Sequence, residues 1–551
     1  MRRAALALLL AIGLVAGCGE SSGDADSDTD VDTDSDADTD TDSDSDADDS
    51  FFREDRACPG SPGCESAEGE LTAGAAKITI TPTVEPFEDQ NDNDNWDDGE
   101  PYTDEDNNGE FTPVFMAGYG GNGANNHAHG VLDETFARVL VLQKGDLRIG
   151  IASLDTVGLL NEDVILVRGA ARNAGAELDH LIVTSDHIHS GPDTVGMWGP
   201  SPIRTGRDPV YIQYLADRTA EALGQAVARL TPVRIMAGIG KTEGLTNDSR
   251  LPIVLDERVT ALRLEKTSDG SPIAAVLHWS NHPEALGGSN RMISADQVGN
   301  TMTVLEAGVP GAVGIYWQGM VGGLLTPLEM DIEDADGKVL PEDSIEKADR
   351  IGELTAEAAL EALSNAEDAT GDGRLAFRRR FFLAPLTNVQ FSLAAAYGVF
   401  NARAYDAEGN ERDPTKFPTY EPHMRTETTV LDFGEVQLVT VPGELFPESA
   451  ITGPGGEWLY QDPQDPGADF FGTPCLPPVW SEMRDTEYKI VLGLGNDELG
   501  YIVPRCQFDG MKPYTYGREE QLYEEVMCVG SEMEPTLLNT IAEELEALEG
   551  M

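Results

Sequence analysis

The stretch Leu181-Ile-Val-Thr184-Ser-Asp-His187-Ile-His189-Ser-Gly-Pro192 decides the fold prediction. Its first four residues are apolar or β-branched, which predicts a β-strand. Polar residues and two histidines follow at once, where the carboxyl end of a strand in an α/β sheet presents ligands. Side chains at i and i+2 of an extended backbone face the same side, so His187 and His189 are expected to point together. Such a pair suits a zinc ligand with a neighbour that contacts the substrate.

Short β-branched runs alternate with helical patterns on both sides of this stretch. The expected strands cover residues 137–142, 148–153, 181–184, 233–237, 259–264, 273–279, 312–316, 374–383, 427–431 and 435–441. The expected helices cover residues 162–173, 209–230, 297–305, 344–363 and 535–548. Alternation of this kind, followed by an antiparallel portion, predicts an α/β fold with mixed β-sheets covered by helices.

A second polar cluster, Trp279-Ser-Asn281-His282-Pro283, also follows an apolar strand directly. A lone histidine at such a place is often structural. Three histidines at the ends of two strands indicate a metal site instead. A further pair, His127 and His129, lies in a turn rich in glycine and asparagine, and for it we expect a loop role rather than a second metal site.

Further short motifs follow the same order as those of a known family. They are Ala73 to Pro82, Met116-Ala-Gly-Tyr-Gly120 with Phe136-Ala-Arg138, His187 to Pro192, Asn281-His282-Pro283, Pro442-Gly-Glu444, Asn496-Asp-Glu-Leu-Gly-Tyr501 and Gln521-Leu-Tyr523-Glu524. Together they resemble the motifs of the neutral ceramidases, the neutral/alkaline non-lysosomal ceramidase family. The resemblance runs from about residue 70 to the C-terminus and covers the catalytic domain only.

The resemblance implies a zinc-dependent amidohydrolase of the ceramidase type. It implies that zinc is held by four residues: His187, His282, Glu444 and Tyr501. It also implies that His189 and Tyr523 lie near the scissile amide and that Arg250 corresponds to an arginine of the family. Two imidazoles, a carboxylate and a phenolate suit zinc, which can lower the pKa of a bound water to about 7.

One segment departs from the family pattern. Where the family has Gly-Asp-Val-Ser-Pro with its catalytic serine, this chain reads Gly322-Gly-Leu-Leu325-Thr326-Pro327. Aligned from the left, the serine position falls on Leu325, and aligned from the proline it falls on Thr326. The Thr326 hydroxyl is expected to orient water or support an oxyanion. Ceramide itself is therefore one of several candidate substrates.

The charge balance limits the classes of partner. The chain holds 37 Lys and Arg against 99 Asp and Glu, a formal net charge of −62, which excludes binding to a phosphate backbone and hence nucleic acid. The hydrophobic fraction of 40% is ordinary, which argues against a polytopic membrane protein.

The N-terminus reads as a lipoprotein signal. Arg2 and Arg3 precede an apolar run that ends in small residues before Cys18, so we expect a signal peptide over residues 1–18 and a lipid anchor on Cys18. Residues 19–69, rich in Asp, Ser and Thr, are expected to form a disordered stalk, and residues 70–551 one catalytic domain. The protein is then exported and anchored to the bacterial outer membrane or cell surface.

The remaining cysteines are expected to form disulfides, because the compartment is oxidising. Proximity in sequence favours Cys58 with Cys64 and Cys506 with Cys528, and leaves Cys475 as the free thiol. Sequence alone does not fix this connectivity.

Residues 87–112 form an acidic insertion that resembles a calcium loop. Asp89, Asn91, Asn93 and Glu100 fall at positions one, three, five and twelve of an EF-hand pattern, although Asp94 replaces the expected glycine. A second half-pattern begins at Asp104. The alternative is a solvated acidic loop.

The sequence therefore predicts a zinc hydrolase that cleaves the amide of N-acylsphingosine or a related lipid-like N-acyl amphiphile. Two alternatives stay open. One is a zinc hydrolase acting on another amide or ester, and the other is a catalytically silent, calcium-stabilised surface lipoprotein that binds a ligand.

Overall fold

The computed structural model describes residues 49–251, 253–451, 475–512, 514 and 518–551. The chain divides into two compact units, Met1–Arg53 and Glu54–Met551. In the first unit the described part is a 3-10 helix, η1 (Asp49–Arg53). The expected signal peptide, Cys18 and almost all of the aspartate-rich run lie outside the described residues. Among the described residues, no helix is both long enough and apolar enough to cross a bilayer.

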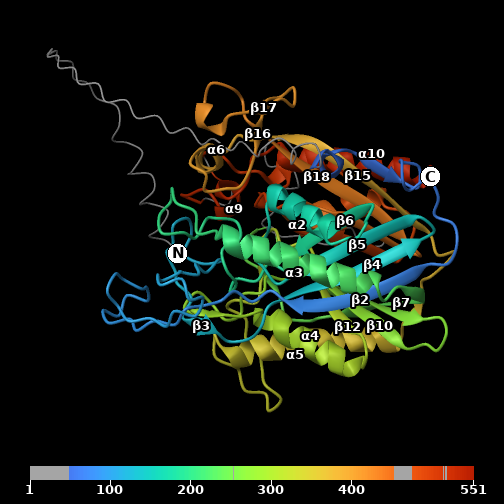
Figure 1. Ribbon diagram of the computed structural model, residues 1–551, viewed down its shortest axis with the longest axis horizontal. Coiled ribbons are helices and arrows are strands. Elements are labelled where there is room, and N and C mark those ends of the chain that lie inside the picture. Colours follow the sequence, from blue (N-terminus) through green and yellow to red (C-terminus); the bar gives the residue numbers. More distant parts are fainter. Residues whose placement is uncertain (1–48, 252, 452–474, 513, 515–517) are drawn as a thin grey trace, which may run out of the picture. The chain divides into compact units, whose positions relative to one another are not determined.

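The larger unit contains a nine-stranded mixed sheet (Figure 1). Its strands, in spatial order, are β12 (Val313–Gln318), β10 (Pro272–Trp279), β9 (Arg258–Lys266), β7 (Thr231–Lys241), β2 (Thr72–Thr79), β4 (Phe136–Lys144), β5 (Leu147–Leu154) and β6 (His180–Ser185), with β14 (Glu367–Asp368) beside β7. The pairs β5–β6 and β10–β12 are parallel. The ends of β6, β10 and β12 are joined by Gln318, whose side-chain amide donates to the carbonyls of Asp186 after β6 and Asn281 after β10.

A second, seven-stranded sheet packs against the first. It contains β1 (Arg56–Cys58), β15 (Leu375–Pro385), β18 (His423–Phe433), β16 (Ala404–Tyr405), β17 (Glu411–Arg412), β19 (Val436–Thr440) and β21 (Tyr488–Leu492). One apolar core joins the two sheets: Leu262 and Ile315 of the first contact a cluster that includes Phe377, Leu431 and Ile490 of the second. Fully buried side chains of this size are the main source of stability of such a sandwich.

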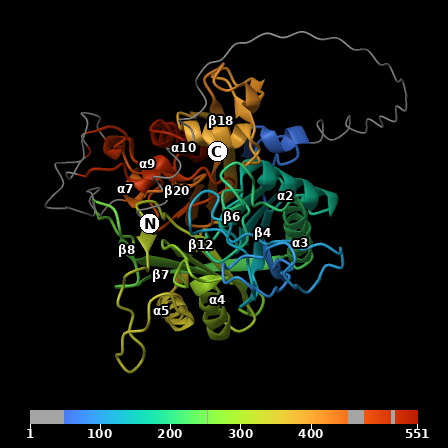
Figure 2. The same ribbon diagram turned by 90° about the vertical axis from the view of Figure 1, so that its left-hand side faces the viewer.

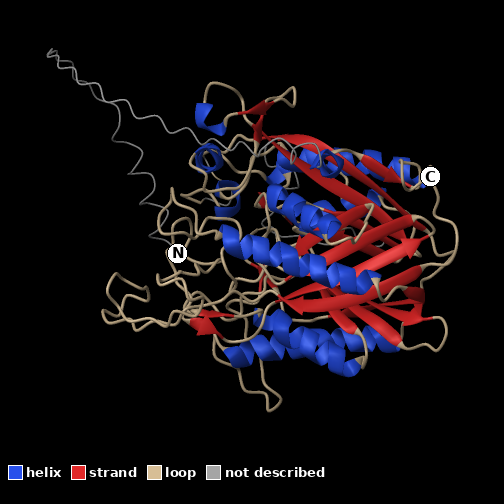
Figure 3. Cartoon of the chain, in the orientation of Figure 1, coloured by secondary structure: helices blue, strands red, loops and turns tan. Residues whose placement is uncertain are grey.

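Helices cover the outer faces (Figure 3). α2 (Asn161–Asn173) and α3 (Pro209–Val227) pack on β2, β4, β5 and β6, while α4 (Asp296–Gly308) and α5 (Ile345–Ser364) pack on β9, β10 and β12. α10 (Met533–Glu549) covers the second sheet. Local chemistry starts two of these helices, because the side chains of Asp208 and Ser344 cap the N-termini of α3 and α5. The predicted α/β class and the five long helices are confirmed.

The remaining elements are short and lie in the connections. They are β3 (Gly130–Val131), β8 (Asn247–Asp248), β11 (Met292–Ile293), β13 (Leu325–Thr326), β20 (Glu444–Leu445), β22 (Tyr501–Ile502), α6 (Val389–Ala396), α7 (Pro447–Ala450), α8 (Val479–Glu482), α9 (Tyr523–Val526), η2 (Pro414–Lys416) and η3 (Arg505–Gln507).

The structure moves the N-terminal boundary of the folded domain to a position before the predicted residue 70. The expected stalk reached residue 69, but Arg56–Cys58 form β1, which pairs with β15 in the second sheet. The Cys58–Cys64 disulfide, as predicted, closes the turn that follows. Backbone pairing and the disulfide order these residues in spite of their polar composition.

The second predicted disulfide is wrong. Cys506 bonds to Cys475, with the two Cα atoms 4.9 Å apart, and Cys528 is a buried free thiol. The reason is spatial: the backbone of Cys528 forms a β-bridge with Gly500, so closeness in sequence to Cys506 does not bring the two sulfur atoms together.

Candidate metal centre

Four segments from distant parts of the chain meet beside the ends of β6, β10 and β12. His187 and His189 follow β6, and His282 follows β10. Glu444 and Tyr501 are paired with each other in the short parallel ladder of β20 and β22. Figure 2 shows the larger unit from the side on which β6, β12 and β20 are labelled. The sheet topology thus brings together residues that are more than three hundred positions apart.

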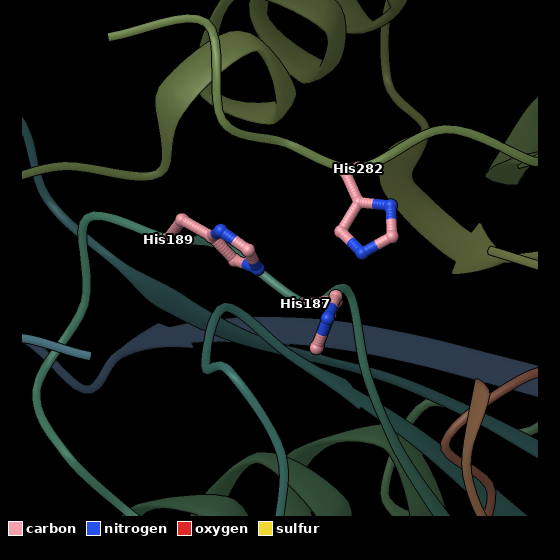
Figure 4. A group of neighbouring side chains, drawn as sticks. All are labelled: His187, His189 and His282. Atoms are coloured by element: carbon pink, nitrogen blue, oxygen red, sulfur yellow. The ribbon is translucent and has the colours of Figure 1, made fainter. Parts of the chain in front are cut away.

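The three histidine rings face one another (Figure 4). Ring centroids are 4.9 Å apart for His187 and His189, 4.9 Å for His187 and His282, and 5.3 Å for His189 and His282. One nitrogen of each ring lies within 4.8 Å of the other two. The cluster is compact enough to hold a metal ion.

His187 is fixed by its backbone and by one hydrogen bond. Its φ of +69° is a left-handed conformation that non-glycine residues seldom adopt, so the expectation of an extended backbone here is wrong. Nδ1 donates to the carbonyl of Val157 at 2.6 Å, and Nε2 lies 3.6 Å from Oε2 of Glu444. Burial, together with the neighbouring histidines, lowers the pKa of His187 well below its ordinary value and keeps the ring in the neutral form that binds metals.

His282 is fully buried and is held in the same way. Nδ1 donates to the carbonyl of Leu325 at 2.8 Å, and Nε2 lies 3.2 Å from Oε2 of Glu444. Burial alone lowers the pKa of His282, but the hydrogen bond to Glu444 and the charges of Glu444 and Glu284 raise it above the ordinary value. In the metal-free protein Glu444 is thus the hydrogen-bond partner of this ring.

This donor set fits zinc. Nδ1 of each ring donates to a backbone carbonyl, so the Nε2 atoms of His187 and His282 and the Glu444 carboxylate face one point, where a cation would replace the proton that His282 shares with Glu444. Two ligand atoms about 2.1 Å from a tetrahedral metal lie about 3.4 Å apart. The separations here are 3.6 and 3.2 Å, which bracket that value.

Tyr501 pairs with Glu444 in the ladder of β20 and β22, and Tyr523 lies beside Tyr501. Tyr501 is buried, and its pKa is raised by burial and by the charge of Glu444. The ring of Tyr523, on α9, is 5.8 Å from that of Tyr501 and is half-exposed. The structure therefore places both predicted tyrosines near Glu444, with Tyr501 buried and Tyr523 half-exposed.

His189 and Thr326 meet at a residue that sequence reasoning missed. Nδ1 of His189 lies 3.2 Å from Oε2 of Glu284, and the Thr326 hydroxyl donates to Oε1 of the same carboxylate. Burial opposes ionisation of Glu284, but the contacts with His189, the charge of His282 and the Thr326 hydrogen bond lower its pKa to about 2. Its place two residues after His282, at a strand end, was the signal that could have identified it.

Arg250 does not join the histidines. It is buried, and its Nη1 and Nη2 atoms donate to Glu525 at 2.8 and 2.7 Å. A further contact runs from Nη2 to the carbonyl of Gln507 at 3.2 Å. These contacts tie the segment after β8 to α9, the helix that begins at Tyr523. The structure therefore supports a role in holding the rim rather than one at the reacting atoms.

Hydrogen bonds within the loop order the acidic insertion. Asp89 accepts backbone hydrogen bonds from Asn91, Asn93 and Asp94, and the Glu100 carboxylate accepts two more from the same loop. In the second half-pattern the carboxylate of Glu85 lies within 4.8 Å of those of Asp104 and Asp106.

The His127 ring serves as a loop contact. Its Nδ1 accepts a hydrogen bond from the backbone N–H of Trp96 at 3.0 Å, which ties the acidic insertion to the glycine-rich turn. Burial lowers the pKa of His127 to about 4, so the ring is neutral and able to accept.

Comparison with known proteins identifies a shared fold. No protein-family model matches this chain. The solved structure of a neutral ceramidase from Pseudomonas aeruginosa aligns over 88% of this chain and 75% of its own length, with a TM-score of 0.61 and 16% sequence identity. A structure described as ceramidase complexed with C2 aligns over 87% and 75%, with a TM-score of 0.62 and 16% identity. The expected neutral ceramidase-type fold is thereby confirmed.

Proposed function

We propose that this protein is a zinc-dependent hydrolase that cleaves the amide bond of N-acylsphingosine or a related N-acyl amphiphile to a fatty acid and an amine. One observation carries the proposal: the Nε2 atoms of His187 and His282 and a carboxylate oxygen of Glu444 converge at the spacing of zinc ligands. The fold shared with ceramidases supports the substrate class.

The residues divide into those that hold the metal and those that face the substrate. His187, His282, Glu444 and Tyr501 would hold zinc, which when bound polarises a carbonyl and lowers the pKa of water. His189 turns one ring nitrogen towards the other two rings, where it is placed to accept a hydrogen bond from water or substrate at the centre (Figure 4). Tyr523, half-exposed beside Tyr501, is placed to contact the substrate at the rim.

We propose attack by water, because the segment from Gly322 to Pro327 lacks the serine of the ceramidase family. The Leu325 carbonyl is occupied in holding His282, and the Thr326 hydroxyl donates to Glu284. For the same reason another amide or an ester is the second candidate substrate, since the difference from the ceramidases falls on the segment that carries their serine.

Two accessory features complete the proposal. A lipid anchor on Cys18 would hold the exported enzyme at the membrane surface where amphiphilic substrates gather. Calcium bound by Asp89, Asn91, Asn93 and Glu100 would stabilise the acidic insertion, because these side chains supply oxygen ligands in one loop. Calcium titration of the full chain tests the second feature: we expect a higher Tm and slower proteolysis within residues 87–112, and no change in either would refute it.

The experiment compares variants of two neighbouring histidines, one at the end of β10 and one just after it. Zinc-loaded full-length protein is assayed on ceramide and on a panel of N-acyl amides and esters, together with His282→Gln and His278→Gln. His278 also lies at the end of β10 and is buried, but its Nε2 donates to the carbonyl of Val491, away from the three rings. We expect turnover by the wild type and the His278 variant and none by the His282 variant. A wild type that holds zinc but cleaves no amide or ester would overturn the proposal.

A further inference from the structure

Glu284 lies where three segments of the centre are joined by backbone hydrogen bonds. The N–H of His189 donates to the carbonyl of Pro283 at 3.0 Å, and the N–H of His282 donates to the carbonyl of Leu325 at 2.8 Å. The loop beyond is held by Asp296, whose carboxylate accepts from the N–H of Ala285 at 3.0 Å. Hydrogen bonds to Pro283 and Ala285 therefore hold the backbone on both sides of Glu284, independently of the contacts of its side chain.

The Glu284 side chain bridges two groups that face the metal centre. It is only 6% exposed, one carboxylate oxygen lies 3.2 Å from Nδ1 of His189, and the other accepts from the Thr326 hydroxyl. Its own carbonyl accepts from the hydroxyl of Tyr119 at 2.7 Å, and the Tyr119 ring packs edge-on against His189 at 5.4 Å. His189 is thus confined by a carboxylate on one side and an aromatic ring on the other.

We propose that Glu284 is a positioning residue of the centre, which fixes the orientation of the His189 ring and of the Thr326 hydroxyl. This inference rests on the proposed function. A carboxylate at Nδ1 keeps the hydrogen on that nitrogen and directs Nε2 to the opposite side, which here is the side of His187 and His282. Glu284 thereby sets which atom of His189 meets the substrate.

The same geometry assigns a supporting role to Thr326. Its hydroxyl hydrogen is directed to Glu284, and its oxygen accepts from the N–H of Leu328 at 3.0 Å. The hydrogen and one of the two lone pairs of the hydroxyl are therefore used within the protein. Thr326 acts on the reaction through Glu284, and the attacking group is water.

The test separates positioning from folding and from metal binding. Glu284→Gln retains the shape of the side chain but removes its charge, and Glu265→Gln serves as the matched control, because Glu265 is a buried carboxylate on β9 paired with Arg234 and Arg263. In Glu284→Gln we expect retained zinc content and a kcat lowered about 10–100-fold with KM little changed. Thr326→Val should lower kcat by a smaller factor, and Glu265→Gln should leave it unchanged.

A second readout does not depend on turnover. Nitrogen NMR of 15N-histidine-labelled full-length protein reports the protonated ring nitrogen of each histidine, and His189→Ala assigns the resonance. We expect the His189 Nδ1–H signal to shift or broaden in Glu284→Gln and to stay in place in Glu265→Gln. An unchanged His189 signal would overturn the inference even if no substrate has been found. A loss of 1,000-fold or more in Thr326→Val, with zinc retained, would also overturn it, since it would identify Thr326 as the nucleophile.

Discussion

Gly118 lies where the glycine-rich turn packs against His189. We predict that its replacement by alanine destabilises the protein or displaces His189. A Cβ atom at Gly118 would lie 2.5 Å from Cβ and 2.6 Å from Cγ of His189, and the backbone there has φ of +100°. Side chains cost roughly 1–2 kcal/mol in left-handed backbone. Overpacking adds about 1–3 kcal/mol. We therefore expect Gly118→Ala to lower the free energy of unfolding by about 2–5 kcal/mol, or to displace His189.

Gly121 in the same turn supplies the matched control. Its φ is +72°, but a Cβ atom there would meet no atom of the described residues within 4 Å. Gly121→Ala therefore carries the backbone cost without the clash. Urea unfolding of both variants measures the difference, and kcat on the best substrate of the panel measures displacement of His189, which can lower the rate about 100-fold for a shift of about 1 Å. Equal stability and equal kcat in the two variants would refute the proposed packing of Gly118 against His189.

Three further predictions test the surroundings of the centre. Arg250→Met leaves Glu525 buried without its partner and should therefore lower the free energy of unfolding by about 3–5 kcal/mol. Urea unfolding measures this change, and a loss under about 1 kcal/mol would contradict the buried ion pair. Cys475→Ser opens a loop of sequence separation 31 and should cost about 4 kcal/mol, and non-reducing peptide mapping should recover Cys475 joined to Cys506 rather than to another cysteine. Burial raises the pKa of Asp248 to about 9 in the folded state, whereas the pKa of an aspartate in the unfolded chain is about 3.9. Between these two pH values the folded state holds a proton that the unfolded state has lost. The stability of the wild type relative to Asp248→Asn should therefore fall as pH rises from 5 to 8, and a difference that rises or stays flat would contradict the assignment.

The long elements could be predicted because their signals are local. Apolar periodicity located β6, β10 and the five long helices to within a few residues, and a proline after Asp208 marked the start of α3. Polar residues directly after apolar strands then indicated that His187 and His282 follow β6 and β10, and the fold brings these two strand ends together. β21 (Tyr488–Leu492) was not predicted.

The details of the centre depend on contacts between distant segments, which no local pattern contains. The left-handed backbone of His187 follows from its place between Val157 and Glu444, and its own neighbours in sequence favour an extended chain. The bridge from Glu284 to Thr326 spans 42 residues, and the pairing of Cys475 with Cys506 spans 31. Residue types pointed to metal chemistry, but only the fold shows which carboxylate faces which ring.

The most direct test of the central claim is the zinc content of the purified full-length protein, measured by elemental mass spectrometry beside His187→Ala and His282→Ala. Circular dichroism of each sample confirms that it is folded. Near-stoichiometric zinc in the wild type that is lost in both variants is the predicted result, because the two Nε2 atoms and Glu444 define the site. A folded wild type that takes up no zinc, or variants that retain it, would contradict the claim that these residues form a zinc centre.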